Sequence, residues 1–184
     1  MSIIIPIRND MGAPASRPRP AGGSALTSLP PLSLYVHLPW CVRKCPYCDF
    51  NSHTADAQLP EDAYVAALET DLREDLAYVQ GRRLTSIFFG GGTPSLMAPE
   101  TVAGVIEAAR AAWPLANDVE ITLEANPTSV EAGRFRGYAD AGVNRLSMGV
   151  QALNDADLKR LGRMHSAAEA RAAGYPDAKT AQAD

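Results

Sequence analysis

The sequence is poor in cysteine and aromatic residues and has no long hydrophobic run. Aromatic residues make up 7% of the 184 residues, and no apolar run approaches the roughly 20 residues of a membrane-spanning helix. The net charge of −4 and the pI near 5.4 give none of the positive charge that attracts nucleic acid or anionic membranes. The N-terminus lacks the basic region and apolar core of a signal peptide. These absences predict a cytoplasmic protein that neither spans a membrane nor binds nucleic acid.

The rest of the composition divides the chain in two. Residues 1–31 contain six prolines and three glycines and few large apolar residues, so this stretch cannot bury enough apolar surface to offset the entropy of ordering it. We therefore expect a disordered leader over residues 1–31. The following residues, 32–184, have the composition and length of one globular domain.

All three cysteines of the chain, Cys41, Cys45 and Cys48, lie within eight positions. Thiolates are soft ligands that suit zinc or an iron–sulfur cluster. A closed structural zinc site takes four ligands, and a disulfide framework takes an even number of cysteines. Three ligands therefore either recruit a fourth, with His37 and His53 as candidates for a Cys3His zinc site, or leave one metal position open. Three reduced, buried cysteines are a further alternative, and we favour the cluster.

From Leu32 onward, strand and helix patterns alternate. Short apolar runs predict strands at residues 34–37, 85–89, 119–124 and 144–148. Apolar residues repeating with helical period predict amphipathic helices at residues 61–79 and 99–113. Capping-box pairs and an N-cap predict further helices from Thr128 to about Gly142, from about Asn154 and from Ser166. Four strand–helix repeats with short joins predict a parallel α/β sheet, which closes either as an open doubly wound sheet or as a (β/α) barrel.

Unusual polar residues and glycines follow each predicted strand. The cysteines follow the first strand, residues 90–94 (Gly-Gly-Gly-Thr-Pro) follow the second, Glu124 ends the third and Gln151 follows the fourth. In both kinds of parallel sheet the carboxyl ends of the strands line the site. Taken singly, the glycines also fit a tight turn that needs positive φ, and Glu124 and Arg163 also fit solvated charges.

The spacing Cys-x3-Cys-x2-Cys is the signature of the radical S-adenosylmethionine (SAM) enzymes, which the sequence resembles. The longer segment 35–52, Tyr-Val-His-Leu-Pro-Trp-Cys-Val-Arg-Lys-Cys-Pro-Tyr-Cys-Asp-Phe-Asn-Ser, resembles the oxygen-independent coproporphyrinogen III oxidase-like family, and within it the haem chaperone branch. The resemblance covers residues 34–165. It selects the barrel and implies the N-terminal part of a radical SAM partial (β/α)6 TIM-like barrel with about four β/α units.

The resemblance also implies ligands and partners. In this family three thiolates hold a [4Fe–4S] cluster and SAM chelates the fourth iron, which assigns the metal to Cys41, Cys45 and Cys48. The positions that match the family's SAM contacts are Tyr35, Tyr47, Gly92, Thr93, Pro94, Glu124, Gln151 and Arg163. The chaperone branch implies haem as a further ligand, a recipient haemoprotein as partner and an electron donor. No residue is assigned a catalytic role, and His165 is assigned none of any kind.

Two departures from the family pattern bear on function. The oxidase branch, which decarboxylates coproporphyrinogen III oxidatively, has another cysteine where this chain has Phe50, so the chaperone is favoured over the oxidase. Residues 166–184 contain no Val, Ile, Leu, Phe or Met, so they provide no fifth strand, although the family continues with further strand–helix units. We expect a truncated chain whose sheet edge and apolar surface are uncovered and whose stability is marginal.

Overall fold

Four strands form one parallel sheet, and their side chains alternate between an apolar and a polar face. The computed structural model describes residues 28–55, 58–79, 81–128 and 133–174, and Pro31–Asp184 forms one compact unit. The strand order is β1-β4-β5-β6, with bounds β1 (Leu32–Leu38), β4 (Leu84–Gly91), β5 (Leu115–Ala125) and β6 (Arg145–Met148). All four predicted strands are confirmed. β5 begins earlier than predicted because residues 115–118, which lack an alternating pattern, join through an irregular register.

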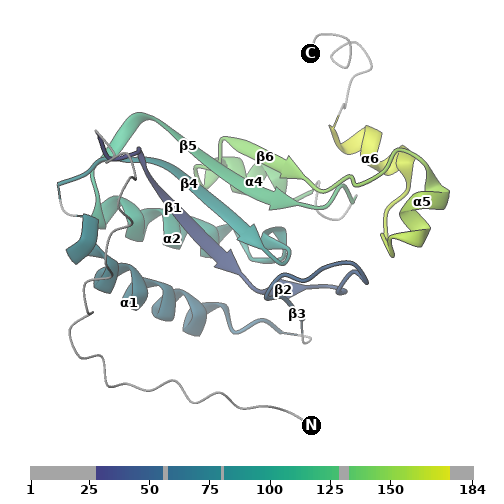
Figure 1. Cartoon of the computed structure of the whole chain (residues 1–184), viewed down its shortest axis with the longest axis horizontal. Helices are drawn as coiled ribbons and strands as arrows, with labels where there is room; N and C mark the ends of the chain where they lie inside the picture. The colour runs from purple at the N-terminus through teal and green to yellow at the C-terminus, as the bar shows by residue number, and fades with distance from the viewer. Residues whose placement is uncertain (1–27, 56–57, 80, 129–132, 175–184) are drawn as a thin grey trace, which may run out of the picture. The chain divides into compact units, whose positions relative to one another are not determined.

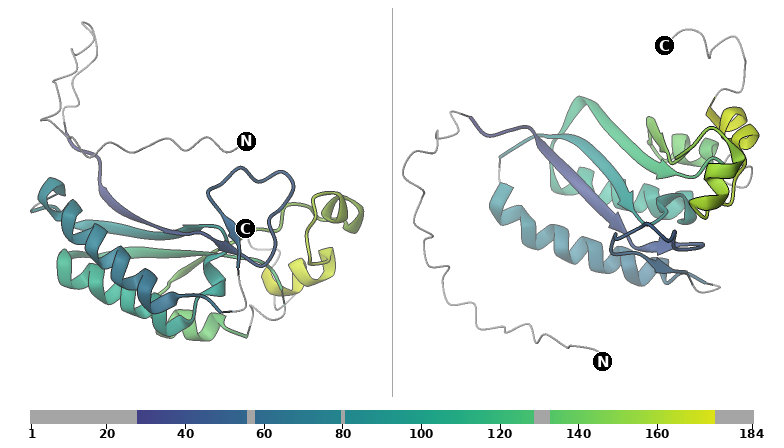
Figure 2. Two further views of the ribbon diagram at one scale, coloured as in Figure 1. Left: turned by 90° about the horizontal axis from the view of Figure 1, so that it is seen from below. Right: turned by 45° about the vertical axis from the view of Figure 1, so that its right-hand side comes forward.

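Helices cover one face of this sheet. Figure 1 and the left view of Figure 2 show that three helices lie along the same side of the strands, namely α1 (Glu61–Val79), α2 (Pro99–Ala112) and α4 (Phe135–Asp140). Beyond the carboxyl ends of the strands lie β2 (Trp40–Cys41), which pairs with β3 (His53–Thr54), together with α5 (Asp155–Arg160) and α6 (Ala167–Gly174). The capping box predicted at Thr128 and Glu131 falls partly on residues 129–132, outside the described residues. No helix in the described ranges is long and apolar enough to cross a membrane.

The hydrophobic core lies between the sheet and these helices. On the sheet side it contains alternate residues of the strands, among them Val36, Ile87, Phe89 and Leu123, each no more than 3% exposed. The predicted stripe of α2 is fully buried, at Val102, Val105, Ile106, Ala109 and Trp113. The predicted stripe of α1 also packs on the core, but its residues stay half-buried, at Val65, Leu68, Leu72, Leu76 and Val79. The first helix is therefore held less tightly than the second.

The opposite face of the sheet is polar. Ser86 Oγ donates to Ser33 Oγ across 2.7 Å, and Glu120 accepts hydrogen bonds from Thr122 and Arg145 at 3.0 and 3.4 Å. Parallel sheets usually have apolar side chains on both faces because helices cover both. Here the helices cover one face, and the other has the polar lining of an open half-barrel. The predicted α/β fold with four β/α units is confirmed.

One buried tyrosine ties α4 to the loop that follows β4. Tyr138 is fully buried, and its hydroxyl lies 2.7 Å from Ser95 O and 2.8 Å from Met97 O. These carbonyls belong to the turn that contains the short helix η1 (Pro94–Leu96). The tyrosine thus holds the segment that carries Pro94 against the helical layer.

We predict that Tyr138→Phe lowers the free energy of unfolding by about 1–3 kcal/mol, because it removes a donor from buried carbonyls and leaves the ring in place. Urea unfolding of the full chain measures the change. Tyr78→Phe is the matched control, since Tyr78 is 83% exposed. Equal stability of the two variants would contradict the prediction.

Candidate functional site

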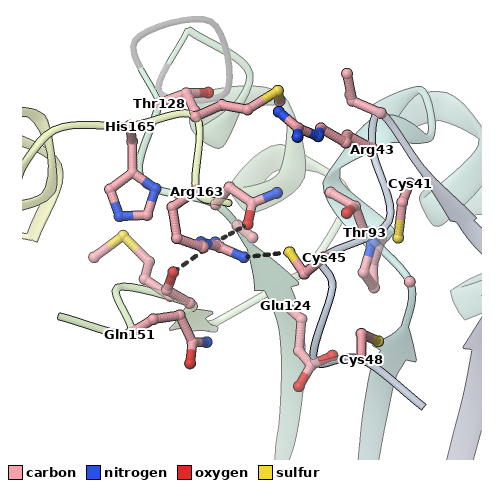
Figure 3. Close-up of a pocket in the computed structure, with 18 of the residues that line it drawn as sticks. Cys41, Arg43, Cys45, Cys48, Thr93, Glu124, Thr128, Gln151, Arg163 and His165 are labelled. Atoms are coloured by element: carbon pink, nitrogen blue, oxygen red, sulfur yellow. Dashed lines mark hydrogen bonds between the residues drawn. The ribbon is translucent and has the colours of Figure 1, made fainter. Parts of the chain in front are cut away.

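A cavity of about 310 Å³ lies at the carboxyl ends of the strands. Every site residue predicted from the sequence lines it except Tyr35; those present are Cys41, Cys45, Cys48, Tyr47, Gly92, Thr93, Pro94, Glu124, Gln151 and Arg163. In Figure 3 the three cysteines lie on one side of the cavity, and Arg163, Gln151 and His165 lie on the other. The fold therefore gathers in one place residues that are up to 122 positions apart in the sequence (41 to 163).

The cysteine loop folds back on itself through a lysine. Lys44 Nζ donates to Phe50 O at 3.2 Å and to Ser52 O at 3.1 Å, and Cys48 N donates to Cys45 O at 3.1 Å. All three thiols are free, and Cys41 is buried. No three His, Cys, Asp or Glu side chains among the described residues stand in a metal-ligating arrangement. The thiols thus share the cavity as a set of soft donors, which fits a cluster by its chemistry.

The two candidate zinc histidines point elsewhere. His37 is bonded on both ring nitrogens, to Tyr35 Oη at 3.2 Å and to Asn51 O at 2.8 Å. His53 Nε2 lies 3.2 Å from Asn51 Oδ1. Neither histidine lines the cavity. Their contacts fasten the end of the cysteine loop to β1 and give the Cys3His alternative no support.

The triple glycine joins the sheet to the cysteine loop. Gly92 N donates to Leu38 O at 2.7 Å, and Thr93 N donates to Trp40 O at 2.6 Å. A Cβ on Gly92 would lie 2.5 Å from Trp40 O, closer than real Cβ atoms come to any such atom. Gly91 has φ +114°, so the positive φ predicted for this segment is confirmed there. Gly92 is required for a different reason, which is the close approach of two backbones.

We predict that Gly92→Ala lowers the free energy of unfolding by about 1–3 kcal/mol, because the methyl group forces two backbone segments apart. Gly104→Ala is the matched control. Gly104 lies in α2 with nothing within 4 Å of its would-be Cβ, so alanine there should raise stability by about 0.5–1 kcal/mol. Urea denaturation of both variants gives the comparison, and an equal effect of the two substitutions would refute the backbone contact.

Glu124 ends β5 as a half-buried carboxylate. Its Oε2 accepts a hydrogen bond from Gly91 N at 3.3 Å, so it faces the neighbouring strand end. Burial raises the pKa of Glu124, and the hydrogen bond from Gly91 opposes that rise only in part. The carboxylate is therefore not the freely solvated one that the sequence left open.

We predict that Glu124→Gln raises the free energy of unfolding at pH 7. Because the pKa of Glu124 is raised in the folded state, its stabilising contribution is present at acid pH and is lost as pH rises through the raised pKa. A neutral amide avoids that loss, so the difference from wild type should shrink toward zero near about pH 4. Chemical denaturation at several pH values measures this, with the exposed Glu74→Gln as control. A difference that grows toward acid pH would contradict it.

Arg163 bridges the two sides of the cavity. Its Nη2 donates to Asn126 Oδ1 at 2.5 Å and to Gly149 O at 2.7 Å, and its Nη1 donates to Cys45 Sγ at 3.5 Å. The dashed lines in Figure 3 follow these three contacts. Arg163 is thus a fixed part of the cavity wall and not a solvated helix charge. Only a planar guanidinium presents donors in enough directions for this arrangement.

The two tyrosines differ in position. Tyr47 lines the cavity, and burial followed by its hydrogen bond with Cys45 raises its pKa. Tyr35 lies outside the lining, stacked on Phe88 with 6.1 Å between ring centroids. Burial and the nearby Glu124 raise the pKa of Tyr35, so it stays close to the site although it does not face the cavity.

Several lining residues were missed from the sequence: Arg43, Phe50, Asn126, Thr128, Ser147, Met148, Gly149, Met164 and His165. Asn126 could have been found, because it stands two residues beyond Glu124 at the end of the same strand. His165 and Met164 carry no local signal. They reach the cavity because the loop after α5 returns toward the strand ends (Figure 3).

These features define a class of protein, namely a parallel α/β half-barrel with a thiol-lined cofactor cavity at its strand ends. Residues 35–174 match the family model of the Radical SAM superfamily, and the chain belongs to this superfamily. Membership implies an iron–sulfur cluster and SAM as cofactors. The donor set of the cavity is compatible with both.

Curated relatives and a solved structure agree with this assignment. The heme chaperone HemW of Escherichia coli is 55% identical over 148 residues, which are 80% of this chain and 39% of the relative. A mitochondrial radical S-adenosyl methionine domain-containing protein 1 of Bos taurus is 46% identical over 88% of this chain and 35% of its own length. The E. coli coproporphyrinogen III oxidase HemN, a radical SAM enzyme, superposes with a TM-score of 0.69 at 31% identity, covering 78% of this chain and 33% of that one. This chain spans about two-fifths of the curated relatives that it matches.

Proposed function

We propose that this chain is the cofactor-binding part of a radical SAM haem chaperone. The observation that supports the proposal is the shared cavity, which collects three thiols, a half-buried carboxylate and an anchored arginine at four strand ends. Relatives named as heme chaperones are 55% and 53% identical to it, whereas the structurally similar oxidase is 31% identical. The balance of similarity favours the chaperone over the oxidase.

Each group in the cavity has a role in this proposal. Cys41, Cys45 and Cys48 would hold a [4Fe–4S] cluster, which supplies an electron for reductive cleavage of SAM. Glu124 would accept hydrogen bonds from ribose hydroxyls, and the Gln151 amide would both donate and accept. Backbone at Gly92, Thr93 and Pro94 would take the methionine end of SAM, and Tyr47 and Arg163 would flank it. Tyr35 would act from behind Glu124.

The partners belong to the same proposal. The chain would work in a reducing compartment such as the cytoplasm, where free thiols and an oxygen-sensitive cluster persist. Haem would be the cargo, a haemoprotein its recipient, and a separate protein would supply the electron.

Anaerobic reconstitution with iron and sulfide tests the cofactor part. We predict that the wild-type chain gains iron, sulfide and a visible charge-transfer absorption, and that SAM perturbs this spectrum. Cys41→Ala, Cys45→Ala and Cys48→Ala should each abolish it, because a three-thiolate site has no spare ligand. Asp49→Ala is the control, since Asp49 is an exposed residue of the same loop that does not line the cavity.

Two results would separate the alternatives. Zinc bound at one per chain, without iron or sulfide, would overturn the cluster and leave a zinc module. A SAM-responsive cluster followed by haem titration tests the chaperone, and haem that binds with the same affinity to wild type and to the Cys45→Ala variant would show that its site is independent of the cluster.

A further inference from the structure

The segment after β6 makes two tight turns in succession. Val150 N donates to Met148 O, and Ala152 N donates to Val150 O, each at 2.9 Å. Both bonds span two residues, which defines γ-turns centred on Gly149 and Gln151. Gln151 has φ +68° and is the one non-glycine residue with positive φ among those described.

The turn at Gln151 is the strained type. A γ-turn with positive φ is rare, and a non-glycine residue persists there only when its surroundings over-determine it. β6 itself is short, and its ladder with β5 ends at Met148. Beyond Met148, backbone pairing with β5 continues only as Gly149 N to Ala125 O, at 2.9 Å. The conformation of Gln151 therefore depends on contacts from elsewhere in the chain.

Those contacts come from one short loop. Arg163 Nη2 donates to Gly149 O at 2.7 Å, and His165 Nε2 lies 3.1 Å from Val150 O. A carbonyl oxygen only accepts, so His165 Nε2 carries the proton. Val150 O thus accepts two hydrogen bonds, one that closes the turn around Gln151 and one from the histidine. Two residues of the loop hold two successive carbonyls of the turn segment.

The histidine is itself fixed. His165 is 5% exposed and lines the cavity (Figure 3). The residues after it form the predicted capping box, in which Ser166 N donates to Glu169 Oε2 at 2.8 Å and Glu169 N donates to Ser166 Oγ at 3.1 Å. Ala167 N donates to Asp155 Oδ1 at 2.8 Å. The capped start of α6 is thereby tied to α5, and His165 is presented from a rigid corner.

We propose that His165 is a positioning residue, which holds the Val150 carbonyl so that Gln151 keeps its strained turn and its place in the cavity wall. For the ligand that Gln151 contacts, this inference rests on the proposed function. The histidine acts through the backbone and not on the ligand. Its role is therefore testable both with and without SAM.

Amide hydrogen exchange by NMR on the full chain tests the turn directly. His165→Leu removes the donor, and exchange at Ala152 N, which closes the turn, should speed up about tenfold relative to Leu158 N in α5. His165→Gln places an amide N–H at a similar reach and should restore protection. Equal exchange at Ala152 in wild type and in His165→Leu, with both folded, would overturn the inference.

A double-mutant cycle on SAM affinity tests the route through Gln151. Calorimetry on the reconstituted protein should show about tenfold weaker binding for His165→Leu and for Gln151→Ala, and no further loss in the double variant. Additive losses would mean that His165 acts apart from Gln151. If wild type binds no SAM, the proposed function fails, and hydrogen exchange alone then decides the role of His165.

Discussion

The close contact between two backbones, the glycine segment after β4 and the chain that leads into the cysteines, is the constraint on which the site depends. Gly92 N and Thr93 N bond to Leu38 O and Trp40 O, and no side chain fits between the two segments at Gly92. The cysteine loop is consequently placed by main-chain hydrogen bonds to the sheet. A loop fixed in this way keeps three thiols at the strand ends without a closed metal site to order them.

The two faces of the sheet determine what else reaches the cavity. Along β5, Ile121, Leu123 and Ala125 are buried against the helices, whereas Glu120, Thr122 and Glu124 alternate with them on the polar face. Because side chains alternate strictly along a strand, the same pattern that buries the core puts Glu124 on the open side at the strand end. Its partial burial there raises its pKa, which is a cost in folding stability at neutral pH that the site tolerates.

Local patterns in the sequence predicted the elements and most of the cavity wall. Alternation gave the strands, helical periodicity gave α1 and α2, and the rule that sites follow the carboxyl ends of parallel strands grouped the cysteines with Glu124 and Gln151. Tertiary hydrogen bonds were out of reach. Arg163 bonds Asn126 across 37 positions, and no periodicity encodes that pair. The half-burial of α1 was equally invisible, since its stripe looks as apolar as that of α2.

The two walls of the cavity are held by different kinds of bond, and this difference has a functional consequence. Main-chain hydrogen bonds fix the cysteine side, whereas the opposite side depends on Arg163 and His165 binding the carbonyls of Gly149 and Val150. A ligand carboxylate can compete for the guanidinium but not for the backbone bonds. Rearrangement on ligand binding should therefore occur on the Arg163 side, while the thiols stay in place and the second carbonyl contact keeps Gln151 from relaxing.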